Sequence, residues 1–491
     1  MTRNLVVFEQ YAEDFGPLTL TRPVYAVRTG LSTLAEKLAG HGAYAGARLC
    51  FHARPQVAAV VPQVIYFNGI FQAGACVNDF SALEREGGLL VDGAVIASLS
   101  KMPAIEGPAE VGVVKQKITE NGKAIERVRV VYARLGAEAL RKAGSVDALL
   151  RQPESAGVPV REVGPEIVFA AFPWDLVINC GKAIEAEFRQ LGGSNSHTPP
   201  GVVFRGPREG SFISTEADIA PGVVIDARGG KVHIAAKVEI QGSVALDARS
   251  GAIVIQEAAK IESGSLIQGP ACIGPKNLIK QATVREGCAF GPVCRVGGEI
   301  EESIIIGYSN KQHLGFMGHA VVGEWVNWGA GTTNSDLKND YSNVVVELSR
   351  GRRIDSGQNK TVGCYIGDHT KTALSTMLNT GTVLGVMSNI LMNGVTEDKY
   401  IPSFCIYDNG RFLPNRTGLK TAETAMSRRS IPLTPEYRKV FEQLQAQLRD
   451  ETREMARAAK KPELTAEQLL GVQFMLKRFG ADFAAWRKAR G

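Results

Sequence analysis

The chain has 491 residues, of which 44% are hydrophobic and 22% charged, and its formal net charge is +6. That length suits two to four domains of roughly 150 residues, the composition excludes a disordered chain, and the small charge gives no support to nucleic-acid binding. No apolar run approaches the roughly 18 residues of a membrane span, residues 1–16 lack a signal-peptide pattern, and the eight cysteines form no CxxC pair. We expect a cytoplasmic protein with reduced thiols and no nucleic-acid or membrane partner.

The first 205 residues alternate short apolar runs with helical patterns. Leu5–Phe8 is typical of an opening buried strand, Leu31–Leu38 has helical spacing, and Ala58–Phe67 is a further strand candidate. Strands that alternate with helices indicate an α/β layer fold. Ser194–Gly201, rich in turn-forming residues, is typical of a linker.

Between about Pro221 and Tyr400, apolar residues recur at every sixth position. The runs at this step are Ile234, Ile240 and Leu246; Ile255, Ile261, Ile267, Ile273 and Ile279; Phe290 and Val296; Val322 and Trp328; and Ile366, Thr372, Leu378, Leu384 and Ile390. A period of six fits neither a helix nor a simple hairpin, and it predicts a left-handed parallel β-helix of hexapeptide repeats. We expect each of these residues to point into a triangular prism that stacked coils fill. Cys288 and Cys294 would then lie on adjacent faces and stay unbonded.

The repeat ends after Pro402, and amphipathic helices are expected at 436–460 and 465–490. The sequence therefore predicts an α/β domain at 1–205, the β-helix at 206–402, and a linker with a short helical tail at 403–491.

Two polar segments interrupt the ladder, and breaks in a regular scaffold are where function tends to lie. The first contains His313, whose neutral imidazole can take a proton near pH 7, as acyl transfer to an amine requires. Asn327 is suited to orient this histidine or to polarise an acyl carbonyl. The plain alternative is a surface histidine on a polar loop. The second segment, 333–360, carries Arg350, Arg352 and Arg353, which suit either phosphate groups or a solvated loop.

The segment from Gly307 to Asp336 resembles the acetyltransferase centre of the bifunctional GlmU family, which makes UDP-N-acetylglucosamine. Lys-Gln-His-Leu-Gly-Phe-Met-Gly at 311–318 stands where the family has Lys-Ala-Gly-His-Leu-Thr-Tyr-Leu-Gly, and Asn-Trp-Gly-Ala-Gly-Thr at 327–332 where it has Asn-Ile-Gly-Ala-Gly-Thr. The resemblance implies that His313 is the catalytic base and that Asn327 acts beside it. The residues that it implies for binding substrate or acetyl-CoA are Lys311, Ala330, Asp336 and Lys371.

An alternate bacterial branch of this family is similar over Pro17–Pro23, Pro173–Leu176 and Gly367–Lys371. The resemblance implies that the α/β domain at 1–205 is nucleotidyltransferase-like, with nucleotide binding by Arg22, Arg28 and Lys37, and a metal contact from Asn179. The Gly-x-Gly-Thr-Arg loop of standard sugar nucleotidyltransferases, whose backbone amides cradle phosphates, is missing. Glu13–Gly16 stands in its place.

The resemblance thus implies a homotrimeric transferase with two activities. One acetylates an amino-sugar 1-phosphate with acetyl-CoA, and the other transfers a nucleotidyl group from UTP with Mg²⁺. Two alternatives remain open at this point. One is an acetyltransferase with a degenerate nucleotidyl domain, and the other is a metal enzyme of the γ-carbonic-anhydrase type that would use His313, His319 and His369.

Overall fold

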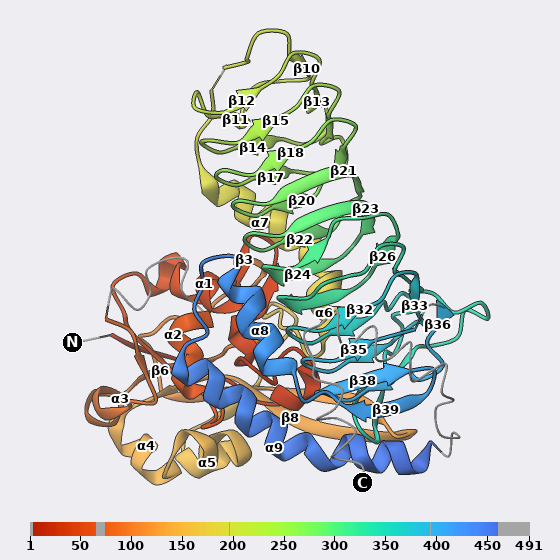
Figure 1. The fold of residues 1–491 in the computed structure, drawn as a ribbon. Helices are drawn as coiled ribbons and strands as arrows, with labels where there is room; N and C mark the ends of the chain where they lie inside the picture. The colour runs from red at the N-terminus through yellow and green to blue at the C-terminus, as the bar shows by residue number, and fades with distance from the viewer. Residues whose placement is uncertain (1–2, 65–73, 196, 393, 460–491) are drawn as a thin grey trace.

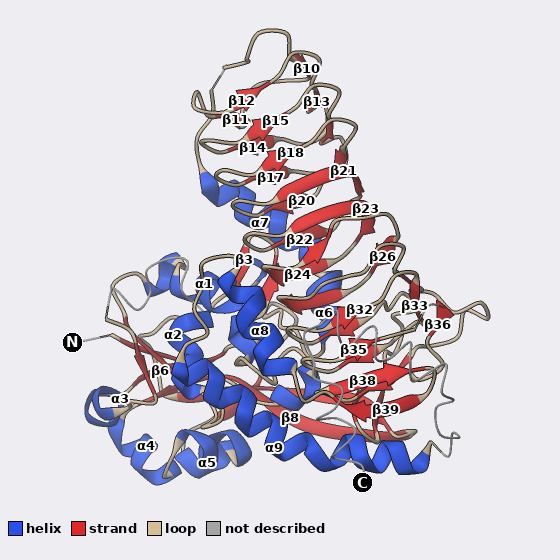
Figure 2. Ribbon diagram, viewed as in Figure 1, coloured by secondary structure: helices blue, strands red, loops and turns tan. Residues whose placement is uncertain are grey.

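The computed structural model describes residues 3–64, 74–195, 197–392 and 394–459 (Figure 1). An N-terminal α/β domain packs against one side of a long β-helix, and helices of the C-terminal tail lie across both (Figure 2). No helix of the described part is both long and apolar enough to cross a membrane. The predicted combination of an α/β domain, a parallel β-helix and a helical tail is confirmed.

The N-terminal domain is built on a mixed sheet whose central strand is the predicted opening strand. In this sheet β1 pairs in parallel with β4 and β6, and its side chains are buried on both faces. Its own strands are β1 (Asn4–Phe8), β4 (Arg48–Phe51), β5 (Cys76–Val77), β6 (Gly88–Asp92), β7 (Glu110–Glu120), β8 (Lys123–Leu135) and β9 (Val160–Glu162). The short pair β2 (Arg28–Thr29) and β3 (Ser32–Thr33) lies outside it. Its helices are α1 (Leu34–Ala39), α2 (Val61–Val64), α3 (Ser81–Glu86), α4 (Ala137–Ala143), α5 (Val146–Arg151), α6 (Pro173–Ile178) and α7 (Cys180–Leu191).

Two of the three predicted elements of this domain agree with the structure, and one does not. The strand at Leu5–Phe8 and the helix within Leu31–Leu38 correspond to β1 and α1. The strand predicted at Ala58–Phe67 is wrong over its described part, because residues 58–64 form a 3₁₀ turn followed by α2. Pro62 lies in the first turn of that helix, where a residue without a backbone N–H costs no hydrogen bond. Residues 65–67 lie outside the described residues.

The β-helix is a prism with three ladders of parallel strands. The first face stacks β11 (Phe212–Ile213), β14 (Val232–Ile234), β17 (Ile253–Ile255), β20 (Ala271–Ile273), β22 (Cys288–Phe290), β24 (Ile304–Gly307), β27 (Val321–Glu324), β31 (Tyr365–Ile366), β34 (Val383–Leu384) and β37 (Tyr400–Ile401). The second stacks β12 (Asp218–Ile219), β15 (Glu239–Ile240), β18 (Lys260–Ile261), the start of β21 (Leu278–Val284), the start of β23 (Arg295–Glu301), β25 (Asn310–Lys311), β32 (Lys371–Thr372), β35 (Asn389–Ile390) and β38 (Cys405–Asp408), with β39 (Arg411–Pro414) antiparallel at its edge. The third stacks β10 (Val203–Arg205), β13 (Val224–Asp226), β16 (Ala245–Asp247), β19 (Leu266–Gln268), the ends of β21 and β23, and β26 (Phe316–Gly318), followed by β28 (Thr333–Asn334), β33 (Thr376–Leu378) and β36 (Gly394–Val395). The pairing therefore runs from Val203 to Pro414, slightly beyond the predicted 206–402 at both ends.

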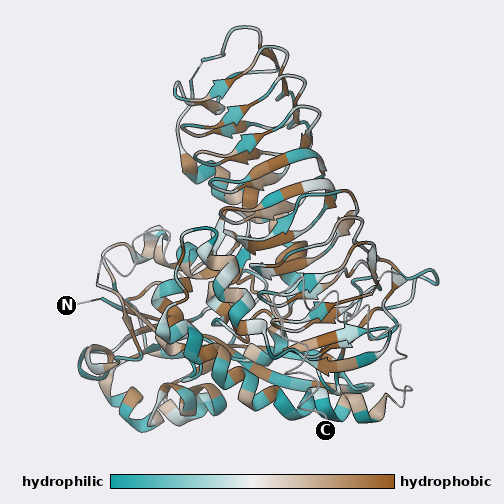
Figure 3. Ribbon diagram, viewed as in Figure 1, coloured by the Kyte–Doolittle hydropathy of each residue, from teal (hydrophilic) through white to brown (hydrophobic). Residues whose placement is uncertain are grey.

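The hexad register predicted from the sequence is confirmed. Every residue of the predicted runs is buried, and the aliphatic ones fill the prism interior. Figure 3 shows the resulting pattern of short hydrophobic stretches interleaved with hydrophilic ones along the prism strands. All eight cysteines are free, Cys288 and Cys294 among them.

Replacing Ile267 with aspartate is expected to destabilise the prism by at least about 3 kcal/mol, because it would bury an unpaired charge. Ile267 is 0% exposed and pairs with Leu246 and Val284 in the adjacent coils. Ser263→Asp, at an exposed turn of the same coil, is the matched control and should change stability by less than about 0.5 kcal/mol. Urea unfolding of the two variants checks this, and equal tolerance would contradict the register.

The outer surface of the first face is also apolar, and this anchors the N-terminal domain. Val254, Cys272 and Ala289 alternate with inward-facing residues, yet each is at most 1% exposed because the domain covers them. Burial of apolar surface contributes roughly 25 cal/mol per Å² to the free energy of folding. The apolar contact along this face therefore holds the two domains together as one packed unit. From β17 onward, the chain's own N-terminal domain therefore covers this face.

A hairpin leaves the prism and extends the N-terminal sheet. The hairpin consists of β29 (Val345–Ser349) and β30 (Arg352–Asp355), and β30 pairs with β7 through Ile354 and Glu120. It lies in the segment 333–360 that the sequence marks as a break in the repeat. That break thus serves to bring a strand pair from the β-helix onto the N-terminal domain.

The C-terminal tail covers a column of aromatic side chains at one corner of the prism. Tyr308, Trp325 and His369 occupy equivalent positions at the corner between the first and second faces, each with a positive φ. The rings of Tyr308 and Trp325 stack at 4.6 Å. Two helices, α8 (Gly418–Ser427) and α9 (Pro435–Ala458), bury this column. The helix expected at 436–460 corresponds to α9, whereas the one expected at 465–490 lies outside the described residues.

Candidate functional site

His313 lies at the corner between the second and third faces of the prism. Its side chain is exposed, and its Nε2 lies 3.4 Å from the side-chain Nε2 of Gln312. Leu314 beside it is 72% exposed. An exposed imidazole at this corner is accessible to a substrate, but the described part of the chain provides no enclosing wall.

Lys311 occupies an interior position of the prism, directly before the corner. Its register partner in the coil above is the buried Val296, and Lys311 itself is 2% exposed. Its ammonium donates hydrogen bonds of 2.8 Å to the carbonyl oxygens of Gly297 and His313. Burial lowers the pKa of Lys311 to about 8. In this arrangement Lys311 ties two turns together rather than facing the solvent where a substrate would lie.

Asn327 and Lys371 share one column on the second face, and Ala330 shares the corner of His313. Asn327 is exposed and bridges Asn310 above and Lys371 below. The amide of Gly331 donates to Leu314 O, which places Ala330 one coil below the His313 turn. Burial lowers the pKa of Lys371 to about 8, and its ammonium donates to His369 O at 3.0 Å. No hydrogen bond joins His313 to Asn327 within the described part of the chain.

Exposed apolar side chains surround this corner. Leu374 stands one coil below Ala330 and is 64% exposed, while Met377 and Val395 are neighbours on the third face with 42% and 55% exposure. Contiguous exposed apolar residues are typical of surfaces that another protein covers. Exposed apolar side chains therefore gather at and beside the corner that carries His313.

Asp336 does not face this corner, since it pairs with His319 at the corner between the third and first faces. Its Oδ2 lies 2.8 Å from His319 Nδ1, and Glu302 Oε2 lies 3.2 Å from His319 Nε2. Burial opposes the charge on His319, but the hydrogen bonds to Asp336 and Glu302 outweigh it and raise the pKa of His319 to about 9. This ion-paired histidine ties together three consecutive coils that precede the hairpin in the chain.

This pKa predicts that His319 stabilises the fold below pH 6.5 and loses its effect as the pH rises towards 9. A pKa that is higher in the folded chain than in the unfolded one stabilises only while the group binds its proton in the folded state. His319→Gln should cost about 1–3 kcal/mol at pH 6 and little at pH 10. Denaturant unfolding at both pH values measures this, with His313→Gln as the control at an exposed corner. A cost that does not shrink at pH 10 would contradict the ion-paired state.

The histidines of the γ-carbonic-anhydrase alternative do not come together. His313, His319 and His369 lie at three different corners of the prism. His369 is 2% exposed, its ring is 6.0 Å from that of Trp325, and burial lowers its pKa to about 3. Across the described residues, no group of three or more His, Cys, Asp and Glu side chains is placed to hold a metal ion. This alternative has no support in the structure.

Arg22 is buried where the N-terminal domain meets the prism. It is 0% exposed, and its guanidinium lies 2.6 Å from Asp368 and 3.2 Å from Glu324. Thr21 and Tyr437 also donate hydrogen bonds to Asp368. These two carboxylates stack in successive coils, and the single positive charge of Arg22 is shared between them. This placement assigns Arg22 a structural role in place of the nucleotide contact that the resemblance implies.

The other two basic residues of the predicted nucleotide site differ in their surroundings. Lys37 on α1 is buried and lies 2.7 Å from Glu187 of α7, and burial lowers its pKa. Arg28 is 5% exposed, but it lines a cavity between the two domains. Asn179, the predicted metal ligand, ends α6 and donates to Asp175 O at 2.8 Å. The structure therefore brings Arg28 and Lys37 to one region and leaves Asn179 in a capping role.

The loop that replaces the glycine-rich phosphate loop is covered by the hairpin. Asp14 is 0% exposed and is held by Arg127 and by Arg352 of β30. A Cβ atom on Gly16 would come within 2.5 Å of the carbonyl oxygen of Leu348. The hairpin thus rests directly on this loop. Because hairpin and loop are far apart in the chain, the sequence alone did not indicate this contact.

The carboxylates near the strand ends are engaged by protein groups and do not form a magnesium site. Asp92 is held by Arg129, and Asp175 accepts from the backbone amides of Ala171 and Phe172. Burial raises the pKa of Asp175 to about 6. Mg²⁺ requires oxygen ligands that are free to coordinate it, so the described residues as placed do not fit the ion.

Comparison with known proteins places the chain among transferases. Residues 5–195 match a family model described as sugar nucleotidyl transferase. A bifunctional sugar-1-phosphate nucleotidylyltransferase/acetyltransferase of Sulfurisphaera tokodaii is 34% identical over 150 residues, which cover 29% of this chain and 36% of that protein. The bifunctional protein GlmU of Streptococcus uberis is 31% identical over 123 residues, covering 21% and 26%. Over these segments the chain is similar to GlmU-type proteins.

That similarity confirms the resemblance found in the sequence, but it covers only part of each relative. The alignments span about a quarter to just over a third of the length of these curated relatives. A solved Arabidopsis UDP-N-acetylglucosamine acyltransferase covers 58% of this chain and 92% of its own, at 12% identity and a TM-score of 0.22. So low a score supports no conclusion about the fold or the function of this chain.

Proposed function

We propose that this GlmU-type chain is a cytoplasmic transferase with two activities in the synthesis of UDP-N-acetylglucosamine. The observation that carries the proposal is the exposed imidazole of His313 at a prism corner, on a chain whose N-terminal domain matches sugar nucleotidyl transferases. The prism would acetylate an amino-sugar 1-phosphate with acetyl-CoA, and the N-terminal domain would transfer a uridylyl group from UTP to the sugar phosphate.

In the acetyl transfer, His313 would act as general base. Its neutral imidazole takes a proton from the amine as the nitrogen attacks the thioester carbonyl, so that an N–C bond forms and the C–S bond breaks. The imidazolium then returns the proton to the departing thiolate of CoA. Asn327, exposed on the neighbouring face, would polarise the carbonyl, and the backbone at Ala330 would line the acyl site. Lys311 would support this chemistry by holding the His313 turn.

A homotrimer would complete the site. The first face of the prism is covered by the N-terminal domain, so a second copy can reach only the other two faces. At the corner that these two faces share, Leu314 and Leu374 are the apolar side chains with the highest exposed fraction in the described part of the prism. A neighbouring prism packed there would cover the apolar surface and supply the missing wall of the His313 site.

The nucleotidyl half depends on fewer groups. Arg28 is the implied nucleotide contact that still faces a cavity, and Lys37 lies behind it in an ion pair. Mg²⁺ remains a prediction from the resemblance. The carboxylates of Asp92 and Asp175 already have protein partners.

A specific observation favours a second candidate, an acetyltransferase whose N-terminal domain is purely structural. The hairpin covers the loop at Glu13–Gly16, and both carboxylate oxygens of Asp14 are held by arginines. Pyrophosphate release from UTP and N-acetylglucosamine 1-phosphate separates the candidates. Release above the rate of a sample without sugar phosphate supports two activities, and its absence in a sample that acetylates supports the second candidate.

A further inference from the structure

Two cysteines lie opposite each other at one edge of the N-terminal sheet. Cys50 on β4 and Cys76 on β5 are register partners in adjacent parallel strands, and β5 is the outermost strand on that side. No other strand pair in the described part of the chain places two cysteines in register. Neighbouring strands lie about 4.8 Å apart, and the Cα atoms of a disulfide lie about 4.4–6.8 Å apart. The two strands therefore have the spacing that a disulfide requires.

The sulfurs of these two cysteines also converge on one acceptor. Cys50 Sγ lies 3.3 Å, and Cys76 Sγ 3.5 Å, from the carbonyl oxygen of Asp79. Burial, and then a hydrogen bond with the thiol of Cys76, raise the pKa of Cys50 to about 12. The two thiols are therefore in direct contact on the same side of the sheet, and both are free.

The two thiols differ in their access to solvent. Cys76 is the one cysteine of the eight that is not buried, whereas Cys50 is 5% exposed. Both line a small cavity of about 10 Å³, together with Asn4 and Leu83. This volume is close to the minimum that holds one water molecule, and hydrogen peroxide is only slightly larger than water. Because the thiolate is the reactive form and burial keeps Cys50 protonated, a small oxidant would react first at Cys76.

We propose that Cys50 and Cys76 are a site of reversible oxidation by peroxides, at which a disulfide joins β4 to β5. The Cys76 thiolate attacks the peroxide, so that an S–O bond forms, the O–O bond breaks, and the released hydroxide takes up a proton to become water. The sulfur of Cys50 then attacks the sulfenic sulfur of Cys76. The S–S bond forms, the S–O bond breaks, and the hydroxide leaves with the proton of the Cys50 thiol as a second water. Two thiols are oxidised and one peroxide is reduced, and an external dithiol reverses the reaction by exchange.

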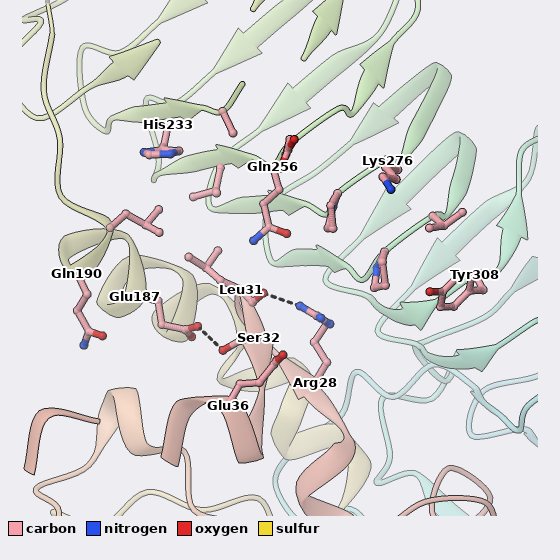
Figure 4. Close-up of a pocket in the computed structure, with 17 residues that line it drawn as sticks. Arg28, Leu31, Ser32, Glu36, Glu187, Gln190, His233, Gln256, Lys276 and Tyr308 are labelled. Atoms are coloured by element: carbon pink, nitrogen blue, oxygen red, sulfur yellow. Dashed lines mark hydrogen bonds between the residues drawn. The ribbon is translucent and has the colours of Figure 1, made fainter. Parts of the chain in front are cut away.

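This pair is separate from both sites of the proposed function. The cavity at Arg28 lies between the two domains, and none of its described lining residues is a cysteine (Figure 4). His313 lies at a corner of the prism. A disulfide between Cys50 and Cys76 would instead fasten the outermost strand to the N-terminal sheet, so acetyl transfer should be the same in the reduced and the oxidised chain.

Thiol titration of the full chain in denaturant tests the proposal. The reduced chain should react with eight equivalents of a thiol reagent, because all eight cysteines are free. After brief exposure to hydrogen peroxide and its removal, we expect the loss of two equivalents, and dithiothreitol should restore them. Mass spectrometry of a digest prepared without reductant should show the peptides of Cys50 and Cys76 joined within one chain.

Three variants assign the reaction to this pair. Cys76→Ala should lose no thiols in the same exposure, because the accessible sulfur is gone. Cys50→Ala should form a sulfenic acid at Cys76 that a dimedone probe labels, because no second thiol is there to displace it. Cys405→Ala, which removes a buried cysteine of the prism, is the matched control and should lose two thiols like the unaltered chain. Thermal unfolding before exposure shows that each variant is folded.

Four results would overturn the proposal. They are the survival of all eight thiols, a disulfide in any other pair or between two chains, oxidation of Cys76 in the unaltered chain without a disulfide, and a loss in Cys76→Ala equal to that of the unaltered chain. None of these measurements uses transferase activity, so the proposed function and this oxidation site can fail independently of each other.

Discussion

Replacing His313 with alanine is expected to lower kcat for acetyl transfer about 10²–10⁴-fold, the usual contribution of a positioned general base. The substitution removes an exposed side chain, so the prism and its stability should be unaffected. Acetyl-CoA-dependent thiol release in the presence of glucosamine 1-phosphate measures the loss. Gln312→Ala, at the adjacent position of the same turn, is the matched control and should retain most activity.

Binding of CoA and the mass of the assembly separate a catalytic role from a structural one. Both should be the same for His313→Ala and the unaltered chain, because the imidazole contributes to the reaction and not to the fold. If His313→Ala keeps more than half of the activity, the histidine is a surface residue and the assignment of the site fails.

Replacing Arg22 with methionine is expected to destabilise the folded chain by about 3–5 kcal/mol, the cost of removing one partner from a buried ion pair. Without the guanidinium, Glu324 and Asp368 would face each other in successive coils at a buried corner. Methionine fills a similar volume without a charge, so the loss of stability measures the effect of removing the positive charge. Equilibrium unfolding in urea provides the measurement.

A triple variant tests the electrostatic explanation. Adding Glu324→Gln and Asp368→Asn to Arg22→Met removes the two carboxylates and should recover a large part of the lost stability. The opposite pattern, an unchanged stability together with weaker UTP binding in Arg22→Met, would return Arg22 to the nucleotide site.

The prism was predictable because its signal is local and repeated. Each coil needs an apolar residue at the same step, so Ile255 to Ile279 specify register without knowledge of anything distant. The N-terminal strand at Leu5–Phe8 is predictable because its signal, a short apolar run, is also local. The α2 segment is not, because a short apolar run is compatible with either a strand or a helix until its neighbours are known.

The site was less predictable because its contacts depend on distant segments. Arg22 resembles a phosphate ligand in sequence, and only the docking of the N-terminal domain brings it to Asp368. His369 lies in a stack of corner residues with positive φ, a conformation that sequence normally associates with glycine. Trp325 and Tyr308 adopt it here because stacking under α9 stabilises all three rings. Lys311 likewise occupies an interior position that the repeat otherwise gives to aliphatic residues.

The most direct test of the central claim is one reaction that contains the chain, glucosamine 1-phosphate, acetyl-CoA, UTP and Mg²⁺, followed for thiol, pyrophosphate and UDP-N-acetylglucosamine. Thiol and pyrophosphate are both expected to accumulate with the product. With His313→Ala, thiol release should be lost while pyrophosphate release from added N-acetylglucosamine 1-phosphate continues. Thiol release that is absent, or that is equal in the unaltered chain and in His313→Ala, would contradict acetyl transfer at His313.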